Sequence, residues 1–468
     1  MKKKAFGATA AAAGLLAGVA GMICRIGLTR AQTASTDPGA NHMARTVTVG
    51  EGAYAGTTNA AIQKAIDDVA AAGGGTVIVP AGTYMMHDAL HLRSKVRVTG
   101  REGAVLKKVP SVSSPIVDFL GYGHYEITVA DPDKFRVGMG VHVLDDNAGG
   151  FYTTVATITG RKDDALFIDR MLNHDYLPRA HARAVTAYPL VEGTDVRDAA
   201  VEGLVLDGNY PAETFRLNGC RGGGVFLIGC RGVRVEGVEV RNYHGDAVSF
   251  QQCVDILVAD CHLHHNTGHG LHPGSGSVRY VMRKVRSHHN GECGIYYCLR
   301  TTHSILADCD LSDNGQQGIS IGTRDSDHEI RGNRVVGNAL AGVEFRGAVR
   351  RGGDRTILRG NTIGPNGTKG AAAEIVLTRG LNDVLIEANT IAPGDRQVLR
   401  VEAGCRRVWF AGNTVAGRPQ QRGDASVAPD SEVGFESPTT FPPVGPAALP
   451  LDGARHLNLP RLPKWREP

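Results

Sequence analysis

The sequence predicts an all-β fold, a parallel β-helix built as a solenoid of turns of about 24 residues. The first observation is an asparagine that recurs at intervals of 24, 24, 24, 24 and 28 residues. Such regularity without a coiled-coil pattern indicates one structural unit stacked on copies of itself. This first column consists of Asn242, Asn266, Asn290, Asn314, Asn338 and Asn366.

The second observation is a strand and a second polar column with the same period. Most of the asparagines are followed after four residues by a glycine and an alternating strand, as in Gly318-Ile319-Ser320-Ile321. Asparagines stacked at successive turns can bond to one another and to the turn backbone, which satisfies polar groups that a buried bend would leave unpaired. The second column reads Cys261, Val285, Cys309, Asn333, Asn361, Asn389 and Asn413.

Composition is the third observation. The 468 residues include 61 glycines and only 6% aromatic residues, which suits many tight bends and argues against a helical protein. The formal net charge is +4, but residues 1–31 carry five basic residues and no acidic ones, so the remainder stands at −1. A nearly neutral chain gives no indication of nucleic-acid binding.

The N-terminal residues 1–31 are predicted to be a secretory signal peptide. Lys2-Lys3-Lys4 precedes an apolar run from residue 8 to residue 23, and cleavage after Ala31 fits the pattern. The alternative is an N-terminal membrane anchor, although Arg25 interrupts the apolar run. We expect a secreted or periplasmic protein with no membrane attachment once the signal is removed.

A helix from about Ala60 to Ala72 is expected at the start of the β-helix domain, which we assign to residues 46–417. Its apolar residues follow helical spacing, Thr57-Thr58-Asn59 supplies its N-terminal cap, and glycines end it before the first strand near Thr76. Such a helix covers the open apolar end of the first turn.

Two segments depart from the repeat. Residues 117–187 contain alternating runs such as Gly140-Val141-His142-Val143-Leu144, which indicate a β-rich insertion. Residues 418–468 hold 10 of the 21 prolines and no repeat, so we expect a proline-rich irregular tail.

The opening of the domain resembles that of pectate-lyase-like right-handed β-helix proteins. The resemblance is carried by Ala60-Ala61-Ile62-Gln63-Lys64-Ala65-Ile66 and by Gly73-Gly74-Gly75-Thr76-Val77-Ile78-Val79-Pro80-Ala81-Gly82-Thr83-Tyr84. It implies a right-handed helix over most of residues 46–417. It implies little about the reaction, since the superfamily includes lyases, glycosidases, epimerases and phage tailspikes.

A narrower likeness points to polygalacturonases. Gly268-His269-Gly270 resembles the Gly-His-Gly strand of that family, and Asp246 matches one of its paired aspartates. Gly245 replaces the other aspartate, and Gly222-Gly223-Gly224 stands where a third is expected. Inverting hydrolysis needs two carboxyl groups about 6.5–9.5 Å apart, so a hydrolase of this kind would need Glu292 as its second.

Chemistry-bearing side chains concentrate in a few turns, because nine of the 18 histidines fall between His244 and His303. The position two after the glycine forms one predicted outward column, and a second column lies beside it. The outward column is Phe226, Ser249, His272, Tyr296, Ser320 and Glu344, beside Asp246, His269, Cys293 and Gln317. We predict the catalytic residues Asp246, His269, His272 and Tyr296, and the substrate-binding residues His244, Gln251, Glu292, Arg300 and Arg324.

This set favours β-elimination from a uronate-containing polysaccharide. His272 and Tyr296 could act as base and acid, and Arg300 or Arg324 could hold the sugar carboxylate. The alternatives are a polygalacturonase-like glycoside hydrolase, and a glycan-binding or adhesion β-helix without catalysis. A further alternative is that these polar residues only make the surface soluble.

No cofactor or metal ligand is assigned from the sequence. Asp308, Asp310 and Asp313 could hold calcium, but no calcium-loop motif supports this. The turn histidines His264, His265, His288 and His289, with His262, could either bind a transition metal or only stack from turn to turn. Oligomeric state and the sugar are left open.

Overall fold

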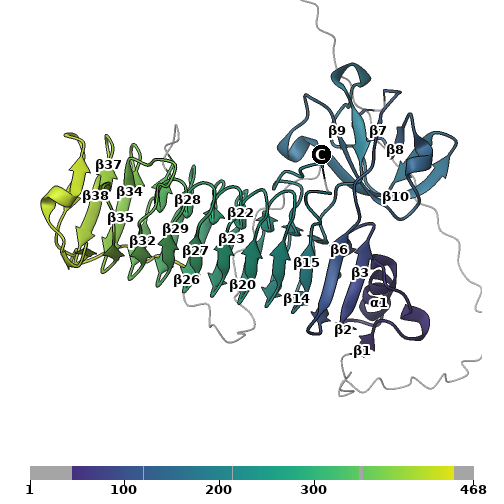
Figure 1. Ribbon diagram of the computed structural model, residues 1–468, viewed down its shortest axis with the longest axis horizontal. Coiled ribbons are helices and arrows are strands. Elements are labelled where there is room, and N and C mark those ends of the chain that lie inside the picture. Colours follow the sequence, from purple (N-terminus) through teal and green to yellow (C-terminus); the bar gives the residue numbers. More distant parts are fainter. Residues whose placement is uncertain (1–44, 120, 213, 347–351, 447–468) are drawn as a thin grey trace, which may run out of the picture. The chain divides into compact units, whose positions relative to one another are not determined.

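The computed structural model describes residues 45–119, 121–212, 214–346 and 352–446. The predicted signal peptide, residues 1–31, lies outside them. Within the described residues the chain visits three parallel sheets in turn, so that each turn stacks on the preceding one (Figure 1). This confirms the prediction of a parallel β-helix.

The three sheets of the helix are named here in the order in which the chain enters them. The first sheet contains β1 (Arg45–Thr48), β2 (Gly75–Val79), β5 (Val96–Gly100), β14 (Ala200–Glu202), β17 (Arg234–Glu236), β20 (Val254–Ala259), β23 (Val278–Arg283), β26 (Thr302–Ala307), β29 (Ser326–Arg331), β32 (Thr356–Arg359), β35 (Asn382–Glu387), β38 (Arg406–Ala411) and β42 (Val433–Gly434). The second sheet contains β3 (Gly82–Met86), β6 (Ala104–Lys108), β15 (Val205–Asp207), β18 (Glu239–Arg241), β21 (His262–His264), β24 (Arg286–His288), β27 (Asp310–Ser312), β30 (Arg334–Val336), β33 (Thr362–Ile363), β36 (Thr390–Ile391), β39 (Thr414–Val415) and β40 (Arg418–Pro419). The third sheet contains β4 (Leu90–His91), β13 (Val191–Thr194), β16 (Val225–Ile228), β19 (Val248–Gln251), β22 (Leu271–Gly274), β25 (Ile295–Tyr296), β28 (Ile319–Ile321), β31 (Val343–Phe345), β34 (Ala373–Leu377), β37 (Gln397–Val401) and β41 (Ala425–Val427).

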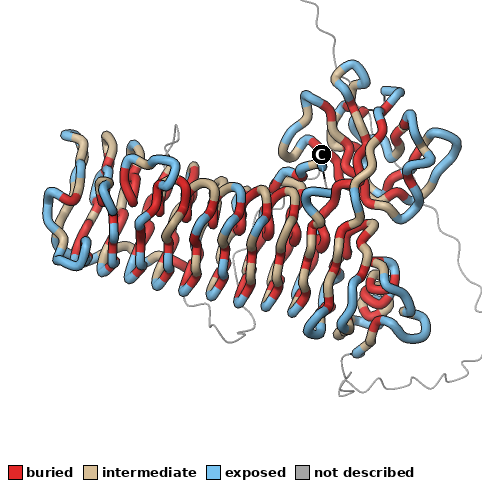
Figure 2. The backbone as a smooth tube through the Cα atoms, viewed as in Figure 1, coloured by how far each residue is buried: buried red, intermediate tan, exposed pale blue. Residues whose placement is uncertain are grey.

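The core runs along the inside of these sheets as columns of aliphatic side chains. Leu271 pairs with Ile295 and Ile295 with Ile319, a register of 24 residues, and all three are fully buried. Figure 2 shows the buried residues alternating with more exposed ones along each turn. The strict period therefore keeps the same face of every strand inside.

The asparagine column forms a buried hydrogen-bonded ladder between the second and third sheets. Asn266 Nδ2 donates to Asn290 Oδ1 at 3.0 Å, and the same bond repeats through Asn314 and Asn338 to Asn366. Asn242 is not part of it, because Asn266 Oδ1 instead accepts the backbone N–H of Tyr243 at 3.0 Å. The prediction for Asn242 was wrong by one position, since this turn is 23 residues long.

The N-terminal helix α1 (Asn59–Ala71) buries Ile62, Ala65, Ile66 and Val69 against the first turns. Thr58 occupies its N-cap, but its side chain makes no capping hydrogen bond. The apolar stripe along one face of the helix therefore covers the end of the core, and hydrogen bonds of Asn59 with His87 and of Gln63 with His91 fix the helix in place.

The segment between β6 and β13 forms a separate antiparallel sheet with its own apolar core (Figure 2). Its strands are β7 (Ser113–Pro115), β8 (Glu126–Thr128), β9 (Gly140–Leu144), β10 (Thr154–Lys162), β11 (Ala165–Ile168) and β12 (Arg183–Val185). The short 3-10 helices of the chain are η1 (Gly52–Tyr54), η2 (Pro132–Lys134), η3 (Gly150–Tyr152), η4 (Pro178–Ala180) and η5 (Arg422–Asp424).

The sheets continue beyond Gly417, where the sequence led us to expect an irregular tail. β41 pairs in parallel with β37, and β42 pairs with β38. Val427 and Val433 pack against the core. These strands lack the asparagine that marks the other turns, so the repeat pattern did not reveal them.

Two further features bear on the setting of the protein. Among the described residues, no helix is long and apolar enough to cross a membrane. The eight cysteines of that part of the chain are free thiols.

Candidate functional site

A cleft of about 510 Å³ opens on the outer face of the third sheet. Three successive turns lead into this sheet and carry Asp246, His269 and Glu292, while β22 and β25 supply His272 and Tyr296. The four residues predicted as catalytic, and Glu292, all line this cleft. The fixed step between stacked strands brings them together.

The outward column is in the predicted register, but a loop covers part of it. Phe226 pairs with Ser249, and Ser249 with His272. The backbone carbonyl of Gly219, in the connection between β15 and β16, accepts a hydrogen bond from Ser249 Oγ at 2.6 Å. A Cβ at position 219 would overlap Asp246 and His272, so only glycine allows the loop to approach this closely.

Asp246 and His272 form a buried ion pair. Asp246 Oδ2 lies 2.6 Å from His272 Nδ1, and Asp246 Oδ1 accepts the backbone N–H of His269 at 2.9 Å. Burial opposes ionisation of Asp246, but the neighbouring His269 and His272 lower its pKa to about 2. Burial likewise opposes protonation of His272, but Asp246 and Cys298 raise the pKa of its imidazole to about 9.

Glu292 links His269 to Arg216 at the mouth of the cleft. His269 Nδ1 accepts the backbone N–H of Cys293 at 3.1 Å, so Nε2 carries the proton that faces Glu292 at 3.0 Å. The other oxygen of Glu292 pairs with Arg216 at 2.7 Å. Burial raises the pKa of Glu292, but His269 and Arg216 outweigh it and lower the pKa below its usual value.

Tyr296 contacts both histidines of the cleft. Its ring stacks on His269 with centroids 4.2 Å apart and meets His272 edge-on at 5.3 Å. The Arg346 guanidinium lies 3.8 Å from the ring centroid. Burial raises the pKa of the phenol to about 12, against the opposing charge of Arg346, so Tyr296 keeps its proton at neutral pH.

Four residues predicted to bind substrate do not line the cleft. Gln251 is fully buried and bonds through Nε2 to Ser249 Oγ at 3.0 Å. Arg300 and Arg324 are exposed at left-handed turn positions after the third sheet, beyond the strand positions that face the cleft. His244 bonds to Thr267 Oγ1 at 2.8 Å and lies against Tyr210.

The cleft instead draws on residues that the repeat pattern did not identify. Arg216 comes from the connection between β15 and β16, and Arg346, which follows β31, packs on the ring of the cleft residue Tyr296. One signal for Arg216 was present in the sequence, because Val191 pairs with Val225 after 34 residues instead of 24. An extra ten residues in one turn must leave the sheet and can cover its outer face.

The two carboxylates of the cleft are closer than their sequence separation suggested. One oxygen of Asp246, one of Glu292 and a ring nitrogen of His269 all lie within 4.8 Å of one another. Residues two turns apart on the same face of a β-helix are separated by roughly 10 Å, the distance that the spacing of Asp246 and Glu292 predicts. The difference arises because the Glu292 side chain reaches back to His269.

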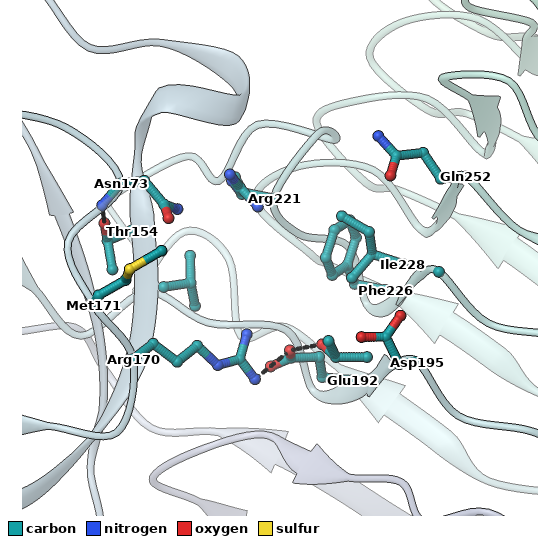
Figure 3. Close-up of a pocket in the computed structure, with 13 residues that line it drawn as sticks. Thr154, Arg170, Met171, Asn173, Glu192, Asp195, Arg221, Phe226, Ile228 and Gln252 are labelled. Atoms are coloured by element: carbon teal, nitrogen blue, oxygen red, sulfur yellow. Dashed lines mark hydrogen bonds and ion pairs between the residues drawn. The ribbon is translucent and has the colours of Figure 1, made fainter. Parts of the chain in front are cut away.

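A second cavity of about 280 Å³ lies between the antiparallel sheet and the third sheet (Figure 3). Arg170 crosses it to pair with Glu192 at 2.6 Å, and Asp195 and Arg221 add further charges. Phe226 lines it and belongs to the column of His272, two turns away. Both cavities therefore lie along one face of the helix.

Comparison with known proteins supports the fold. Residues 202–363 match the family model for the right handed beta helix region. The chain folds as a right-handed parallel β-helix. A search of curated protein sequences gave no match.

Solved structures with the same fold include carbohydrate-active enzymes. The A-module of the Azotobacter vinelandii mannuronan C-5 epimerase AlgE4 has a TM-score of 0.50 at 18% identity, covering 79% of this chain and 95% of that one. The AlgE6 A-module of the same organism has a TM-score of 0.51 at 18% identity, covering 82% and 96%. The Thermotoga maritima exopolygalacturonase has a TM-score of 0.48 at 14% identity, covering 84% and 90%. At 18% identity, the likeness to the two epimerase modules supports the fold and not the reaction.

Proposed function

We propose that this β-helix is a secreted enzyme that cleaves a uronate-containing polysaccharide by β-elimination. The observation that carries the proposal is the buried Asp246–His272 pair beside a protonated Tyr296 and two arginines. Elimination needs a base for the C5 proton, an acid for the leaving oxygen and a partner for the sugar carboxylate. The cleft offers a group for each.

In this scheme His272 is the base. Asp246 accepts the hydrogen bond of Nδ1–H, so the neutral imidazole of His272 has its lone pair on Nε2, as in other histidine bases that a carboxylate orients. Nε2 is buried without a hydrogen bond of normal geometry, and Cys298 lies beside it. Substrate reaches it once the Cys298 side chain turns away about its single side-chain torsion.

Tyr296 is the acid. As His272 takes the C5 proton, the electron pair of the C5–H bond forms the C4–C5 double bond and the C4–O4 bond breaks. Tyr296 gives its proton to O4, and the phenolate that remains is stabilised by the Arg346 guanidinium over its ring. Solvent then returns the proton from His272 to Tyr296.

Arg216 is the partner for the sugar carboxylate. Its side chain is exposed at the mouth of the cleft, and a guanidinium has five N–H donors, so it can bind a carboxylate while still facing Glu292. The cavity beside Phe226 lies on the same face, where further sugar units of a bound chain would extend.

Two observations disfavour the polygalacturonase-like hydrolase. An inverting hydrolase places its carboxyl groups about 6.5–9.5 Å apart, whereas oxygens of Asp246 and Glu292 lie within 4.8 Å. It also needs one carboxyl group to stay protonated, and both of these have lowered pKa values.

Product analysis tests the proposal. The full chain is incubated with a panel of uronate polysaccharides, and the expected product is an oligosaccharide with the ultraviolet absorbance of a C4–C5 double bond. Reducing ends without that absorbance would indicate hydrolysis and contradict the proposal. Binding without any product would indicate the glycan-binding alternative. Unchanged chain length with solvent deuterium at C5 would indicate epimerisation, in which the same C5 carbanion is reprotonated.

A further inference from the structure

A group of histidines lies on the outer face of the second sheet, apart from the cleft. His262 and His264 come from β21 and His288 from β24, while His265 and His289 occupy the turns that follow. The rings repeat from turn to turn, because His264 stacks on His288 at 5.4 Å and His265 on His289 at 5.3 Å. The proposed elimination uses none of them.

Three side chains of this group bring potential metal-ligand atoms close together. Glu239 in β18, His262 and His264 each place one ligand atom within 4.8 Å of the other two. His264 Nε2 lies 3.3 Å from Glu239 Oε1. Ligand atoms about 2.0–2.1 Å from a tetrahedral zinc ion are separated by about 3.3 Å, so only small side-chain movements are required.

The rings are held in an orientation that suits metal binding. His264 Nδ1 hydrogen-bonds to His265 Nδ1 at 2.7 Å, which leaves Nε2 for the shared point. The same contact recurs one turn later, where His288 Nδ1 lies 2.8 Å from His289 Nδ1. Metal-ligating histidines in proteins are oriented in this way, by a partner on the ring nitrogen that does not bind the metal.

Solvent can reach this group of side chains. The side chains of Glu239 and His264 are 28% and 15% exposed. Arg241 Nη1 also donates to Glu239 Oε1 at 2.8 Å, but a carboxylate accepts about four hydrogen bonds and can serve both partners.

We propose that Glu239, His262 and His264 form a binding site for a divalent transition-metal ion of the zinc type. Two imidazoles and one carboxylate are the donors that such ions prefer, whereas calcium takes six to eight oxygens. His288 Nε2 lies 2.8 Å from His262 Nε2, so coordination of an ion by His262 Nε2 would break this hydrogen bond, with any proton on that nitrogen moving to Nδ1. The ion would connect β18 to β21 across neighbouring turns.

Zinc binding to the chelator-treated full chain tests this site. Titration calorimetry near neutral pH should show one Zn²⁺ per chain, and thermal unfolding should shift to higher temperature when Zn²⁺ is added. The double variant His262→Ala/His264→Ala should bind at least about tenfold more weakly and lose the thermal shift. His265→Ala, which removes only an orienting contact, should weaken binding by about tenfold.

His181→Ala is the matched control, since this exposed histidine pairs with Asp146 in the antiparallel sheet, outside the group. It should leave zinc binding unchanged. Equal zinc binding by the wild type and the double variant, or no binding by the wild type, would overturn the proposal. X-ray absorption that shows a sulfur ligand would also overturn it, because this site contains only nitrogen and oxygen donors. Calorimetry, thermal unfolding and X-ray absorption are all independent of any activity on polysaccharide.

Discussion

Two groups of histidines lie on either side of the Asn266 turn, one on the second sheet and one in the cleft. In the cleft, His272 faces the carboxylate of Asp246, and the pKa of the imidazole rises to about 9. On the second sheet, burial and the neighbouring imidazoles His262 and His289 lower the pKa of His288 to about 4. At neutral pH His272 is therefore protonated and positively charged, whereas His288 is neutral.

The difference shows that the neighbouring side chains determine the protonation state of each histidine, and with it the chemistry that the histidine can perform. Burial disfavours the charged form in both groups. Asp246 and Cys298 outweigh burial at His272, whereas Glu239 does not outweigh it at His264. A histidine held by Asp246 suits proton transfer, whereas uncharged histidines beside one another suit metal binding. The following predictions remove or isolate these partners.

The largest effect is expected from Asp246→Asn, which removes the carboxylate that makes His272 unlike the other group. Elimination should slow by about a hundredfold or more, because the imidazole loses its orientation and basicity. The pH at which kcat/KM rises should also move to lower values. Asp308→Asn, at an exposed turn, is the control and should leave both quantities unchanged. An unaltered pH profile in Asp246→Asn would show that this pair does not set the base.

Tyr296→Phe should lower turnover by about a hundredfold or more while leaving the unfolding temperature nearly unchanged. The phenol is the proposed acid, and its ring stacking on His269 remains in the variant. Tyr297→Phe is the matched control, since that neighbouring tyrosine points into the core and its hydroxyl has no hydrogen-bond partner among the described residues. Equal turnover in the two variants would remove Tyr296 from the mechanism.

Asn266→Ala should lower the free energy of unfolding by roughly 3 kcal/mol or more, since it leaves several buried groups unpaired. Asn266 accepts the Tyr243 backbone N–H and donates to carbonyls of Val240 and His264 as well as to Asn290. Asn242→Gly, at a partly exposed position with φ of 52°, should change stability little. Chemical denaturation measures both, and equal losses would contradict the register of the ladder.

A smaller effect is expected in the pH dependence of stability. The raised pKa of His272 stabilises the fold fully below its ordinary value of 6.5, and this contribution is lost as pH rises through about 9. The lowered pKa of Asp246 stabilises the fold above 3.8, and its contribution is lost as pH falls through about 2. The stability difference between wild type and Asp246→Asn should therefore shrink as pH rises past 9. A difference that stays constant would contradict the ion pair.

The sequence predicted the features that follow from the regular repeat. The columns through Ser249, His272 and Tyr296 follow from a constant step between turns, and this step also brings Asp246 and His269 together. The features that the sequence could not predict depend on segments that depart from the repeat. Arg216 reaches the cleft from an extended turn, and the loop at Gly219 buries a column that was expected to be open.

The same limit explains why three residues predicted to bind substrate lie outside the cleft lining. Arg300 and Arg324 were chosen because they follow cleft strands, but backbone direction at a left-handed turn determines where they project. Gln251 follows the outward Ser249 by two positions, yet the loop at Gly219 covers it. The position of the Glu292 carboxylate depends on its side chain reaching back to His269, which the spacing of residues along the repeat does not predict.

The pH dependence of elimination, followed by ultraviolet absorbance of the product, tests the central claim most directly. If Asp246-held His272 is the base and Tyr296 the acid, kcat/KM should rise by about tenfold per pH unit until near pH 9. It should fall again only as Tyr296 loses its proton near pH 12. A rate that is flat or falls between neutral pH and 9, or products that never acquire the absorbance, would contradict the account.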